Sequence, residues 1–584
     1  MHLPYRVITA ICLNYYCSVI YDLFGCHCEA RGAGRGNLIV LNNRYCFARN
    51  DTRRLTCCKL TMTYLAVPIA AQNIEQAQQQ TKAALASGAE MLELRTDYLE
   101  NLSVDLARDL VAAVKSIAGR RLPVIVTCRD NRQGGAIAYP QQLRIDVLTA
   151  ALKAGAEFID CEYENFLSAE TQERIRVALS GSSRGRLILS AHNFETKFAG
   201  ISKLYRSILS VCQVAIPKIV YTANHINDCF EAFDLLHQTS GERIIFCMGE
   251  PGIISRIIAK KLNSFVTFAS IDQETATAPG QLTIGQLKEL YRYDFIDAAT
   301  ELYGVIADPV GHSLSPAIHN ACFADAAMNK LYLPLLVKGG RGEFDLFMRN
   351  ILSRKWLNFG GFSVTIPHKE NALKFVQANQ GFVEPLAKKI GAVNTIVITR
   401  DWKSKAYNTD YSASLDSITL GLGITRSGLR EIPVAIIGAG GVARAIVAGL
   451  SDAGAKIKIY NRTVEKAQKL GAEFNCGFAP LDDLANLNAK LVINCTSIGM
   501  HPNVDQTPLP EEYLKKDMVV FDTVYNPAET LLLKQARQKK AKTIDGLSMF
   551  INQALAQFKL FTSQEANPDL MRKTISNWLS YSGD

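Results

Sequence analysis

Hydrophobic and polar positions follow two alternating patterns over most of the chain. From residue 64 onward, short apolar runs rich in β-branched residues are separated by stretches of helical periodicity, such as IEQAQQQTKAALASGA. Near-continuous apolar strands that alternate with helices are typical of a parallel sheet in an α/β protein. The first half contains eight such runs, at residues 64–70, 90–95, 123–129, 157–163, 186–192, 216–223, 243–249 and 264–270. Eight strands within this length predict a closed (β/α)8 barrel.

The pattern breaks at residues 287–304, LKELYRYDFIDAATELYG, and then restarts. Further along, VAIIGAGGVARAIVAGL at 434–450 predicts an apolar strand, a glycine-rich turn and a helix. The sequence shows no internal repeat and no low-complexity linker between the halves. We therefore expect two folded units that follow each other directly.

Length and composition agree with this division. The 584 residues exceed the ~250–300 at which a single core stops growing, and 48% hydrophobic with 20% charged residues excludes a disordered or fibrous protein. The net charge is 64 − 55 = +9 without a long Lys/Arg run, which suits small anionic substrates and gives no nucleic-acid footprint. The longest apolar stretch, residues 7–21, is shorter than the ~18 residues that a membrane span needs. We expect neither nucleic acid nor a membrane as partner.

Residues 1–61 differ from the rest. They hold seven of the 15 cysteines, one Ser, and eight Lys/Arg against three Asp/Glu, without clear periodicity. The basic composition fits a plastid transit peptide but the scarcity of Ser does not, and the apolar run behind Arg6 also allows a secretory signal. Neither Cys26-x-Cys28 nor Cys57-Cys58 has zinc-site spacing, so we expect no metal. We expect that translation starts at Met62, that 1–61 is no folded domain, and that the enzyme is cytosolic, with a plastid as alternative.

Polar residues stand where barrel chemistry takes place, at the carboxyl ends of the predicted strands. Glu93 and Arg95 end the second run, Arg129 ends the third and His192 the fifth. Lys218 lies within the sixth run, and an inward-facing lysine beside other cations has a lowered pKa and acts as a nucleophile. The alternatives are a lysine on the outer face paired with a helix carboxylate, and a histidine that only fills the core.

The set of motifs in this half decides between these alternatives. In this order, the motifs resemble those of the type I 3-dehydroquinate dehydratases: Glu93-Leu94-Arg95, Thr127-Cys128-Arg129 with Gly134-Gly135, Ser190-Ala191-His192-Asn193-Phe194, Pro217-Lys218-Ile219, Met248-Gly249 with Ser255-Arg256, and Ala278-Pro279-Gly280-Gln281.

This resemblance implies a mechanism and a role for each residue. Lys218 would form a Schiff base with the ring ketone of 3-dehydroquinate, whose protonated iminium makes the adjacent C–H bond acidic. His192 would take that proton and later return one to the departing hydroxyl. Arg256 and Gln281 would bind the carboxylate, and the remaining site residues would hold ring hydroxyls and the local charges: Glu93, Arg95, Arg129 and Thr277.

Two positions depart from the family pattern. Gln133 stands where the family commonly has a Glu that orients the histidine, and Thr277 stands where it usually has Ser. An amide can fix the tautomer of His192, but it cannot stabilise an imidazolium by charge. We therefore expect a slower or pH-shifted dehydratase.

In the second half, the glycine-rich turn Gly438-Ala439-Gly440-Gly441-Val442-Ala443 follows a strand and opens a helix. Backbone amides in that context can bind a pyrophosphate. The next strand, KIKIY, ends in Asn461-Arg462-Thr463 rather than in the acidic residue that binds a free ribose hydroxyl. The sequence therefore favours NADP over NAD.

Further motifs surround this turn, and together they resemble those of shikimate dehydrogenase over residues 302–584: Ser313-Leu314-Ser315-Pro316, Val364-Thr365-Ile366-Pro367-His368-Lys369, Gly391-Ala392-Val393-Asn394-Thr395, Asn408-Thr409-Asp410, Asn494-Cys495-Thr496-Ser497-Ile498-Gly499-Met500, Asp522-Thr523-Val524-Tyr525-Asn526-Pro527 and Asn552-Gln553-Ala554. The whole chain thus resembles the fused dehydroquinate dehydratase–shikimate dehydrogenases.

By this resemblance Lys369 and Asp410 form the acid/base pair, and Lys369 protonates the ketone oxygen of 3-dehydroshikimate. Ser313 and Ser315 would bind the carboxylate. The other expected contacts are Thr365, Asn394, Tyr525 and Gln553 to substrate, and Thr496, Ser497, Gly499 and Met500 to NADP. The expected domains are a barrel at 63–290, a substrate domain at 302–412 completed by helices at 547–584, and a Rossmann domain at 430–546. Tyr411 stands where the family usually has Gly.

Two rival functions remain open from the sequence. A quinate dehydrogenase using NAD is disfavoured by the paired serines and by Arg462. A catalytically weak sensor of pathway intermediates would be expected to have lost a catalytic residue, and all four are present: Lys218, His192, Lys369 and Asp410.

Overall fold

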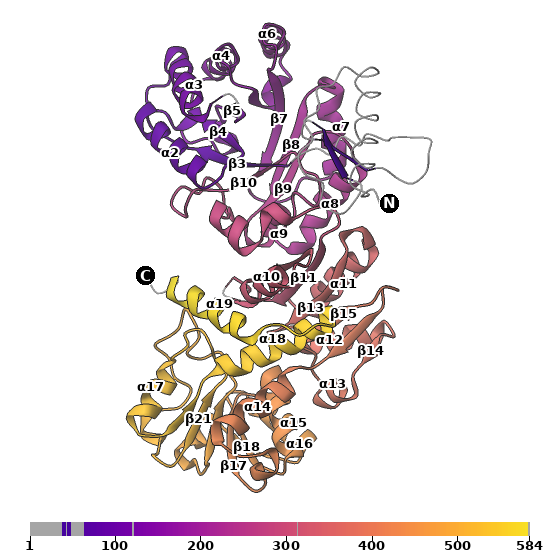
Figure 1. Ribbon diagram of the computed structural model, residues 1–584, viewed down its shortest axis with the longest axis vertical. Coiled ribbons are helices and arrows are strands. Elements are labelled where there is room, and N and C mark those ends of the chain that lie inside the picture. The colour runs from indigo at the N-terminus through magenta and orange to yellow at the C-terminus, as the bar shows by residue number, and fades with distance from the viewer. Residues whose placement is uncertain (1–37, 42–43, 48–62, 120–121, 312, 582–584) are drawn as a thin grey trace, which may run out of the picture. The chain divides into compact units, whose positions relative to one another are not determined.

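The computed structural model describes residues 38–41, 44–47, 63–119, 122–311 and 313–581 (Figure 1). It divides into two compact units, 1–63 and 64–584. In the first unit, β1 (Leu38–Leu41) pairs antiparallel with β2 (Arg44–Phe47), two strands that the sequence pattern did not predict. The expectations about the start site, targeting and cysteines of residues 1–61 otherwise lie outside the described residues.

The first half of the second unit is the predicted barrel, coloured indigo to magenta in Figure 1. Its eight strands are parallel in the order β10-β3-β4-β5-β6-β7-β8-β9. The end strands meet where Phe265 N donates to Arg243 O at 2.8 Å. The strands are β3 (Tyr64–Ile69), β4 (Met91–Arg95), β5 (Val124–Thr127), β6 (Phe158–Glu162), β7 (Arg186–Asn193), β8 (Ile216–Thr222), β9 (Ile244–Met248) and β10 (Val266–Phe268).

Helices cover the outside of this sheet, and apolar side chains fill its interior. The helices start at polar caps where the sequence supplies them, as at Asn73 and Ser103, whose side chains accept backbone N–H groups. The main helices are α2 (Ile74–Ala86), α3 (Val104–Ala118), α4 (Gln141–Lys153), α6 (Ala169–Ser180), α7 (Ile201–Val211), α8 (Cys229–Gln238) and α9 (Ile253–Ile257). The amino-terminal part of the interior is closed by Ala66, Met91, Ile125, Phe158, Ile188, Ile216, Ile244 and Val266.

This apolar plug places the chemistry at the carboxyl ends, because side chains two residues apart on a strand face the same side. Ile216 fills the interior, so Lys218 follows it on the inner face and is buried. Ile188, Ser190 and His192 repeat this spacing on β7. The prediction that Lys218 faces inward is therefore confirmed.

The second half begins with a mixed sheet in the order β12-β11-β13-β15-β16-β14. Its strands are β11 (Glu301–Ala307), β12 (Lys330–Leu336), β13 (Phe359–Val364), β14 (Phe382–Val383), β15 (Thr395–Ile398) and β16 (Ser404–Tyr407). The C-terminal helices return to this lobe, and Figure 1 shows them in yellow beside α10. The helices are α10 (Ser315–Asp325), α11 (Arg341–Ser353), α12 (Lys369–Ala378), α13 (Pro385–Ile390), α18 (Gly546–Thr562) and α19 (Pro568–Tyr581).

The remaining lobe is a parallel six-stranded sheet of the predicted Rossmann type, in the order β19-β18-β17-β20-β21-β22. The strand order reverses between β17 and β20, which opens a crevice at their carboxyl ends. The elements are β17 (Pro433–Ile437), β18 (Lys456–Asn461), β19 (Gly477–Pro480), β20 (Leu491–Asn494), β21 (Val519–Asp522), β22 (Lys542–Ile544), α14 (Asp410–Leu422), α15 (Gly441–Asp452), α16 (Val464–Phe474) and α17 (Leu531–Gln538). The predicted α/β architecture is confirmed.

Two smaller findings concern the described residues only. The eight cysteines from Cys128 to Cys495 are free thiols, and six of them are buried. Within the same ranges, no helix has the length and apolar character that crossing a membrane requires.

Candidate active sites

The barrel mouth holds a cavity that is open to solvent. All eight residues predicted for this half line it, although they come from six separate stretches of sequence: Glu93, Arg95, Arg129, His192, Lys218, Arg256, Thr277 and Gln281. Phe194, Phe246 and Phe268 add apolar walls, and Gln133 and Gly134 close one side. The structure thus brings the whole predicted set together.

Lys218 lines this cavity and is only 4% exposed to solvent. Its Nζ lies 2.7 Å from Asp160 Oδ2, 3.3 Å from Glu93 Oε1 and 4.7 Å from the centre of the Phe268 ring. These partners come from β6, β4 and β10, so with β8 they form one layer of side chains from alternate strands, as barrel interiors do. The prediction that neighbouring cations surround Lys218 is wrong for its immediate contacts, because this layer supplies two carboxylates.

Asp160 connects Lys218 to a buried cation. Arg129 Nη2 donates to Asp160 Oδ2 at 2.8 Å, and Ser190 Oγ donates to Asp160 Oδ1 at 2.5 Å. Burial alone would raise the pKa of Asp160, but Arg129 and Lys218 hold it well below its ordinary value. Asp160 therefore stays ionised and fixes the ammonium group of Lys218.

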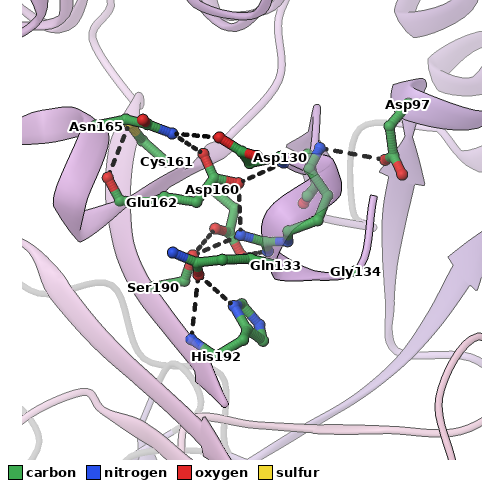
Figure 2. Close-up of polar contacts among 12 residues, drawn as sticks. Asp97, Asp130, Gln133, Gly134, Asp160, Cys161, Glu162, Asn165, Ser190 and His192 are labelled. Atoms are coloured by element: carbon green, nitrogen blue, oxygen red, sulfur yellow. Dashed lines mark hydrogen bonds and ion pairs between the residues drawn. The ribbon is translucent and has the colours of Figure 1, made fainter. Parts of the chain in front are cut away.

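Behind this pair lies a second layer of charges, much of it visible in Figure 2. Glu162 accepts from Arg129 Nη1 at 2.9 Å and from Arg144 Nη1 at 3.0 Å. Arg144 Nη2 also donates to Asp130 Oδ2 at 2.7 Å. Sequence reasoning missed this network, although the strand FIDCE carries Asp160 and Glu162 in a buried run, where an acidic residue needs a partner.

His192 is positioned by Gln133 on the neighbouring loop. Gln133 Oε1 lies 3.2 Å from the backbone N of His192 and 3.2 Å from its Nδ1 (Figure 2). Because the backbone N–H needs an acceptor, the amide oxygen faces the ring, so Nδ1 carries the proton and Nε2 is the free base. Burial, together with Arg129 and Lys218, lowers the pKa of His192 well below its ordinary value. The ring is therefore neutral near pH 7.

Arg256 is the one cation of this set without a carboxylate partner among the described residues. It is 1% exposed, its Nε and Nη2 make no hydrogen bond there, and its guanidinium lies 4.5 Å from the centre of the Phe246 ring. Burial lowers its pKa to about 10. An unpaired buried guanidinium that lines a cavity is suited to an anionic ligand.

The second half has its own cavity. It collects every catalytic and substrate-binding residue predicted for this half: Ser313, Ser315, Thr365, Lys369, Asn394, Asp410, Tyr525 and Gln553. Val442 from the glycine-rich turn also lines it, so the cavity lies where the nucleotide-binding turn meets the substrate lobe.

Lys369 and Asp410 form a close ion pair in this cavity, with Nζ 2.5 Å from Oδ2. Asp410 is the first residue of α14, and Asn408 Oδ1 accepts its backbone N–H at 3.0 Å. The stem of Lys369 passes over Gly441, where a Cβ atom would come within 2.9 Å of the lysine Cδ. The glycine therefore gives the lysine room beside the nucleotide-binding turn.

The sequence reasoning missed several residues of this cavity, among them the polar pair Ser363 and Gln557. Ser363 Oγ lies 2.6 Å from Gln557 Oε1, and both side chains line the cavity. Gln557 stands four residues after the predicted Gln553 on α18, so it occupies the same helix face one turn later. That spacing was a signal for its place in the site.

The predicted nucleotide-binding residues lie at the carboxyl ends of β17, β18 and β20. Gly438 has a φ of +112°, and Gly440, where a side chain would meet open space, precedes the first turn of α15. That first turn holds no acidic residue, so its N–H groups can receive a phosphate. Arg462 and Thr463 are exposed after β18, and Asn461 Nδ2 donates to Thr463 O at 2.8 Å. The loop after β20 carries Thr496, Ser497, Gly499 and Met500.

This set of residues fits a dinucleotide with an added phosphate. A positive φ and an open space at glycine allow the backbone to approach a pyrophosphate, and a cation follows the second strand. Asn494 holds the third loop in place, because its Oδ1 accepts from Thr496 Oγ1 at 2.7 Å and its Nδ2 donates to Asp522 Oδ1 at 2.9 Å.

Comparisons with known proteins give the same division. Residues 65–298 match the type I 3-dehydroquinase family, 305–396 the shikimate dehydrogenase substrate binding domain, 424–548 the shikimate/quinate 5-dehydrogenase family, and 546–575 the shikimate 5′-dehydrogenase C-terminal domain.

The chain is 34% identical over 531 residues to the chloroplastic bifunctional 3-dehydroquinate dehydratase/shikimate dehydrogenase of Arabidopsis thaliana, covering 88% of this chain and 84% of that protein. It is 41% identical over 286 residues to the NADP(+) shikimate dehydrogenase of Methanosarcina mazei, covering 47% and 97%. A solved shikimate dehydrogenase structure in complex with NADP+ is 38% identical, with a TM-score of 0.44 over 49% of this chain and 97% of the other.

Proposed function

Because this chain belongs to the family of bifunctional 3-dehydroquinate dehydratase/shikimate dehydrogenases, we propose that its two cavities catalyse consecutive reactions. The barrel dehydrates 3-dehydroquinate to 3-dehydroshikimate, and the second half reduces that product to shikimate with NADPH. The observation that carries this proposal is the gathering of two sets of scattered residues, each into one cavity.

In the barrel, Lys218 is the nucleophile. Its ammonium must lose a proton before Nζ attacks the ring ketone, and Glu93 is the suitable acceptor because Asp160 is held ionised by Arg129. Glu93 then returns its proton to the hydroxyl of the adduct, which leaves as water. The product is a protonated iminium, which withdraws electrons from the adjacent carbon. Asp160 then faces the positive charge that the iminium retains.

His192 moves the proton in the elimination. Its free Nε2 takes the proton from the acidified carbon, and the resulting imidazolium returns one to the departing hydroxyl, which leaves as water. A second water then hydrolyses the iminium, which releases 3-dehydroshikimate and restores the amine of Lys218. Arg256 binds the substrate carboxylate. Gln281 supports it, since Thr277 N donates to Gln281 Oε1 at 2.8 Å and leaves the amide N–H groups for the ligand.

In the second cavity, Lys369 supplies a proton to the ketone oxygen of 3-dehydroshikimate, and Asp410 keeps the ammonium charged and in place. When bound, NADPH supplies the hydride for the carbonyl carbon. Ser313 and Ser315 bind the carboxylate, while Thr365, Asn394, Tyr525 and Gln553 contact the hydroxyls and the carboxylate.

The chemistry of the predicted cofactor contacts favours NADPH over NADH. The turn 438–443 receives the pyrophosphate, and Arg462 and Thr463 bind the 2′-phosphate, which NADH lacks. NADP(+) shikimate dehydrogenases among the relatives support this choice.

We propose the domain limits 63–290 for the barrel, 302–412 with 547–584 for the substrate lobe, and 430–546 for the nucleotide lobe. The ligands are small molecules, with neither nucleic acid nor a membrane as partner. For the location, we propose the cytosol, with a plastid as the alternative that the chloroplastic relative supports.

The function is tested by mixing the full-length protein with 3-dehydroquinate and NADPH and following absorbance at 340 nm. Consumption of NADPH from 3-dehydroquinate requires both reactions, and formation of 3-dehydroshikimate without a nucleotide isolates the first. We expect both signals, and NADH in place of NADPH to give a much lower rate. Oxidation of quinate with NAD at a higher rate than that of shikimate with NADP would instead support the quinate dehydrogenase, and no turnover at either site would support a sensor.

A further inference from the structure

A hydrogen-bond chain runs along the floor of the second cavity and ends on a tyrosine that does not line it. Tyr332 on β12 has its Oη 2.6 Å from Ser363 Oγ on β13. Ser363 Oγ lies 2.6 Å from Gln557 Oε1 on α18, and Gln557 Nε2 donates to the Asn394 carbonyl oxygen at 3.2 Å. Three separate elements are therefore connected at the cavity, and only Tyr332 lies behind its wall.

The partners fix the direction of this chain. The Asn394 carbonyl can only accept, so it faces the nitrogen of Gln557, and the oxygen of Gln557 faces Ser363. Ser363 must donate to that oxygen, and its single proton is then used. Its contact with Tyr332 is therefore one in which the tyrosine donates.

The surroundings of Tyr332 keep its hydroxyl in place as a hydrogen-bond donor to Ser363. Burial raises its pKa, so the phenol stays protonated. Asn320 fixes its backbone from both sides, because Tyr332 N donates to Asn320 Oδ1 at 2.7 Å and Asn320 Nδ2 donates to Tyr332 O at 2.9 Å. His319 stacks on the phenol ring with centroids 4.4 Å apart, and burial lowers the pKa of His319 to about 3, so no charge develops beside the chain.

These contacts determine what Gln557 offers to a ligand. Its oxygen is held by Ser363, and one of its two amide protons is used on Asn394. Gln557 lines the cavity, so its second amide proton can be presented to a ligand there. Among the described residues of this hydrogen-bond chain, Tyr332 is the one that lies farthest along it from Asn394. Its donated hydrogen bond keeps the Gln557 amide in this orientation.

We infer that Tyr332 is a positioning residue of the reductase: through Ser363 it orients the amide of Gln557, so that the cavity floor presents an N–H donor to a hydroxyl or carboxylate oxygen of the substrate. The inference rests on the proposed reductase function. It gives Tyr332 a role in substrate affinity, although its hydroxyl lies behind the cavity wall.

The test compares Tyr332→Phe with Tyr303→Phe in the full-length protein. Tyr303 is the matched control, because it is also buried in the substrate lobe, on β11, and its hydroxyl donates to Phe561 O at 3.2 Å without touching the cavity. We expect Tyr332→Phe to raise KM for 3-dehydroshikimate about three- to tenfold, the value of one hydrogen bond. We expect KM for NADPH, kcat and the dehydratase rate to stay within about twofold, and Tyr303→Phe to change none of them.

An unchanged KM for 3-dehydroshikimate in Tyr332→Phe, with an active wild type, overturns the inference alone. An equal rise of both KM values, or an equal effect of Tyr303→Phe, also overturns it, because either result indicates general damage to the lobe. A wild type that does not reduce 3-dehydroshikimate removes the proposed function and the inference with it.

A second variant tests whether Tyr332 acts through Ser363. Ser363→Ala removes the link, so the double variant Tyr332→Phe/Ser363→Ala should have the same KM for 3-dehydroshikimate as Ser363→Ala, within about twofold. A KM in the double variant that equals the product of the two single effects contradicts the relay.

Discussion

The two cavities use a lysine in different surroundings. Lys218 contacts two carboxylates, and one of these is bonded to Arg129, which continues into a buried network of charges. Lys369 has a single close carboxylate, Asp410, and its other neighbours in the cavity are hydroxyls, amides and apolar groups. The nucleophile, Lys218, is held by charged side chains on the barrel strands. The proton donor, Lys369, has one close charged partner and lies beside the nucleotide-binding turn.

This difference follows from the proposed chemistry. A covalent intermediate converts an ammonium into an iminium at the same place, so carboxylates built into the strands face positive charge both before attack and after the iminium forms. A proton donor needs only one partner that keeps it charged before the transfer. We therefore expect the two sites to respond independently to substitution and to differ in their contribution to stability.

The largest expected effect comes from replacing each of the two lysines with alanine, one at a time. Lys218→Ala should reduce the dehydratase rate by about 10⁴-fold or more, since the nucleophile is lost. Lys369→Ala should reduce the reductase rate by about 10²–10⁴-fold, the typical contribution of a general acid. Each variant is the control of the other, because the untouched reaction should keep its rate. Loss of both activities in either variant would contradict the independence of the sites.

An intermediate effect should appear in stability. Asp160→Asn removes the buried negative charge that pairs with both Lys218 and Arg129. We therefore expect the free energy of unfolding of the barrel to fall by about 3–5 kcal/mol. Asp410→Asn removes a single pair that opens onto a cavity, where water can reach Lys369, and should cost less. Urea unfolding followed by circular dichroism measures both without relying on either activity. An equal loss in the two variants would contradict the comparison.

The smallest expected effect is a shift in pH dependence. His192 acts as a base in its neutral form, so the dehydratase rate falls as pH drops through its pKa, which lies well below the ordinary value. Gln133→Glu places a carboxylate beside Nδ1, favours the imidazolium and raises that pKa.

The acidic limb of the dehydratase kcat/KM profile should therefore move to higher pH, by about one unit. The reductase profile of the same variant is the control and should not move. An unchanged dehydratase profile would show that the residue at position 133 does not influence the charge of His192.

The hydrophobic pattern was sufficient to predict the barrel, since all eight runs became strands. It left open which face of its strand Lys218 occupies, and the structure places Lys218 inward, two residues after Ile216. The partners of Lys218 were not predicted, because Asp160 and Glu93 lie on strands that are not hydrogen-bonded to β8. They meet the lysine through the layer formed by alternate strands. Applying that layer rule to the predicted strands would have pointed to Asp160.

In the second half, the motifs predicted which residues line the cavity but not how they are oriented. The direction of the contacts between Tyr332, Ser363 and Gln557 depends on three elements that are far apart in the chain, and no local pattern encodes it. The antiparallel pair of β1 and β2 was also missed, because residues 1–61 show no periodicity.

The central claim is that Lys218 becomes covalently bound to the substrate, and reduction of the intermediate tests it most directly. Sodium borohydride added while the enzyme turns over 3-dehydroquinate should convert the iminium into a stable secondary amine. Peptide mass spectrometry should then find the substrate's mass on the peptide that contains Lys218, and nowhere in Lys218→Ala. A chain that carries no such mass on Lys218, or carries it on another lysine, would contradict the account of the barrel.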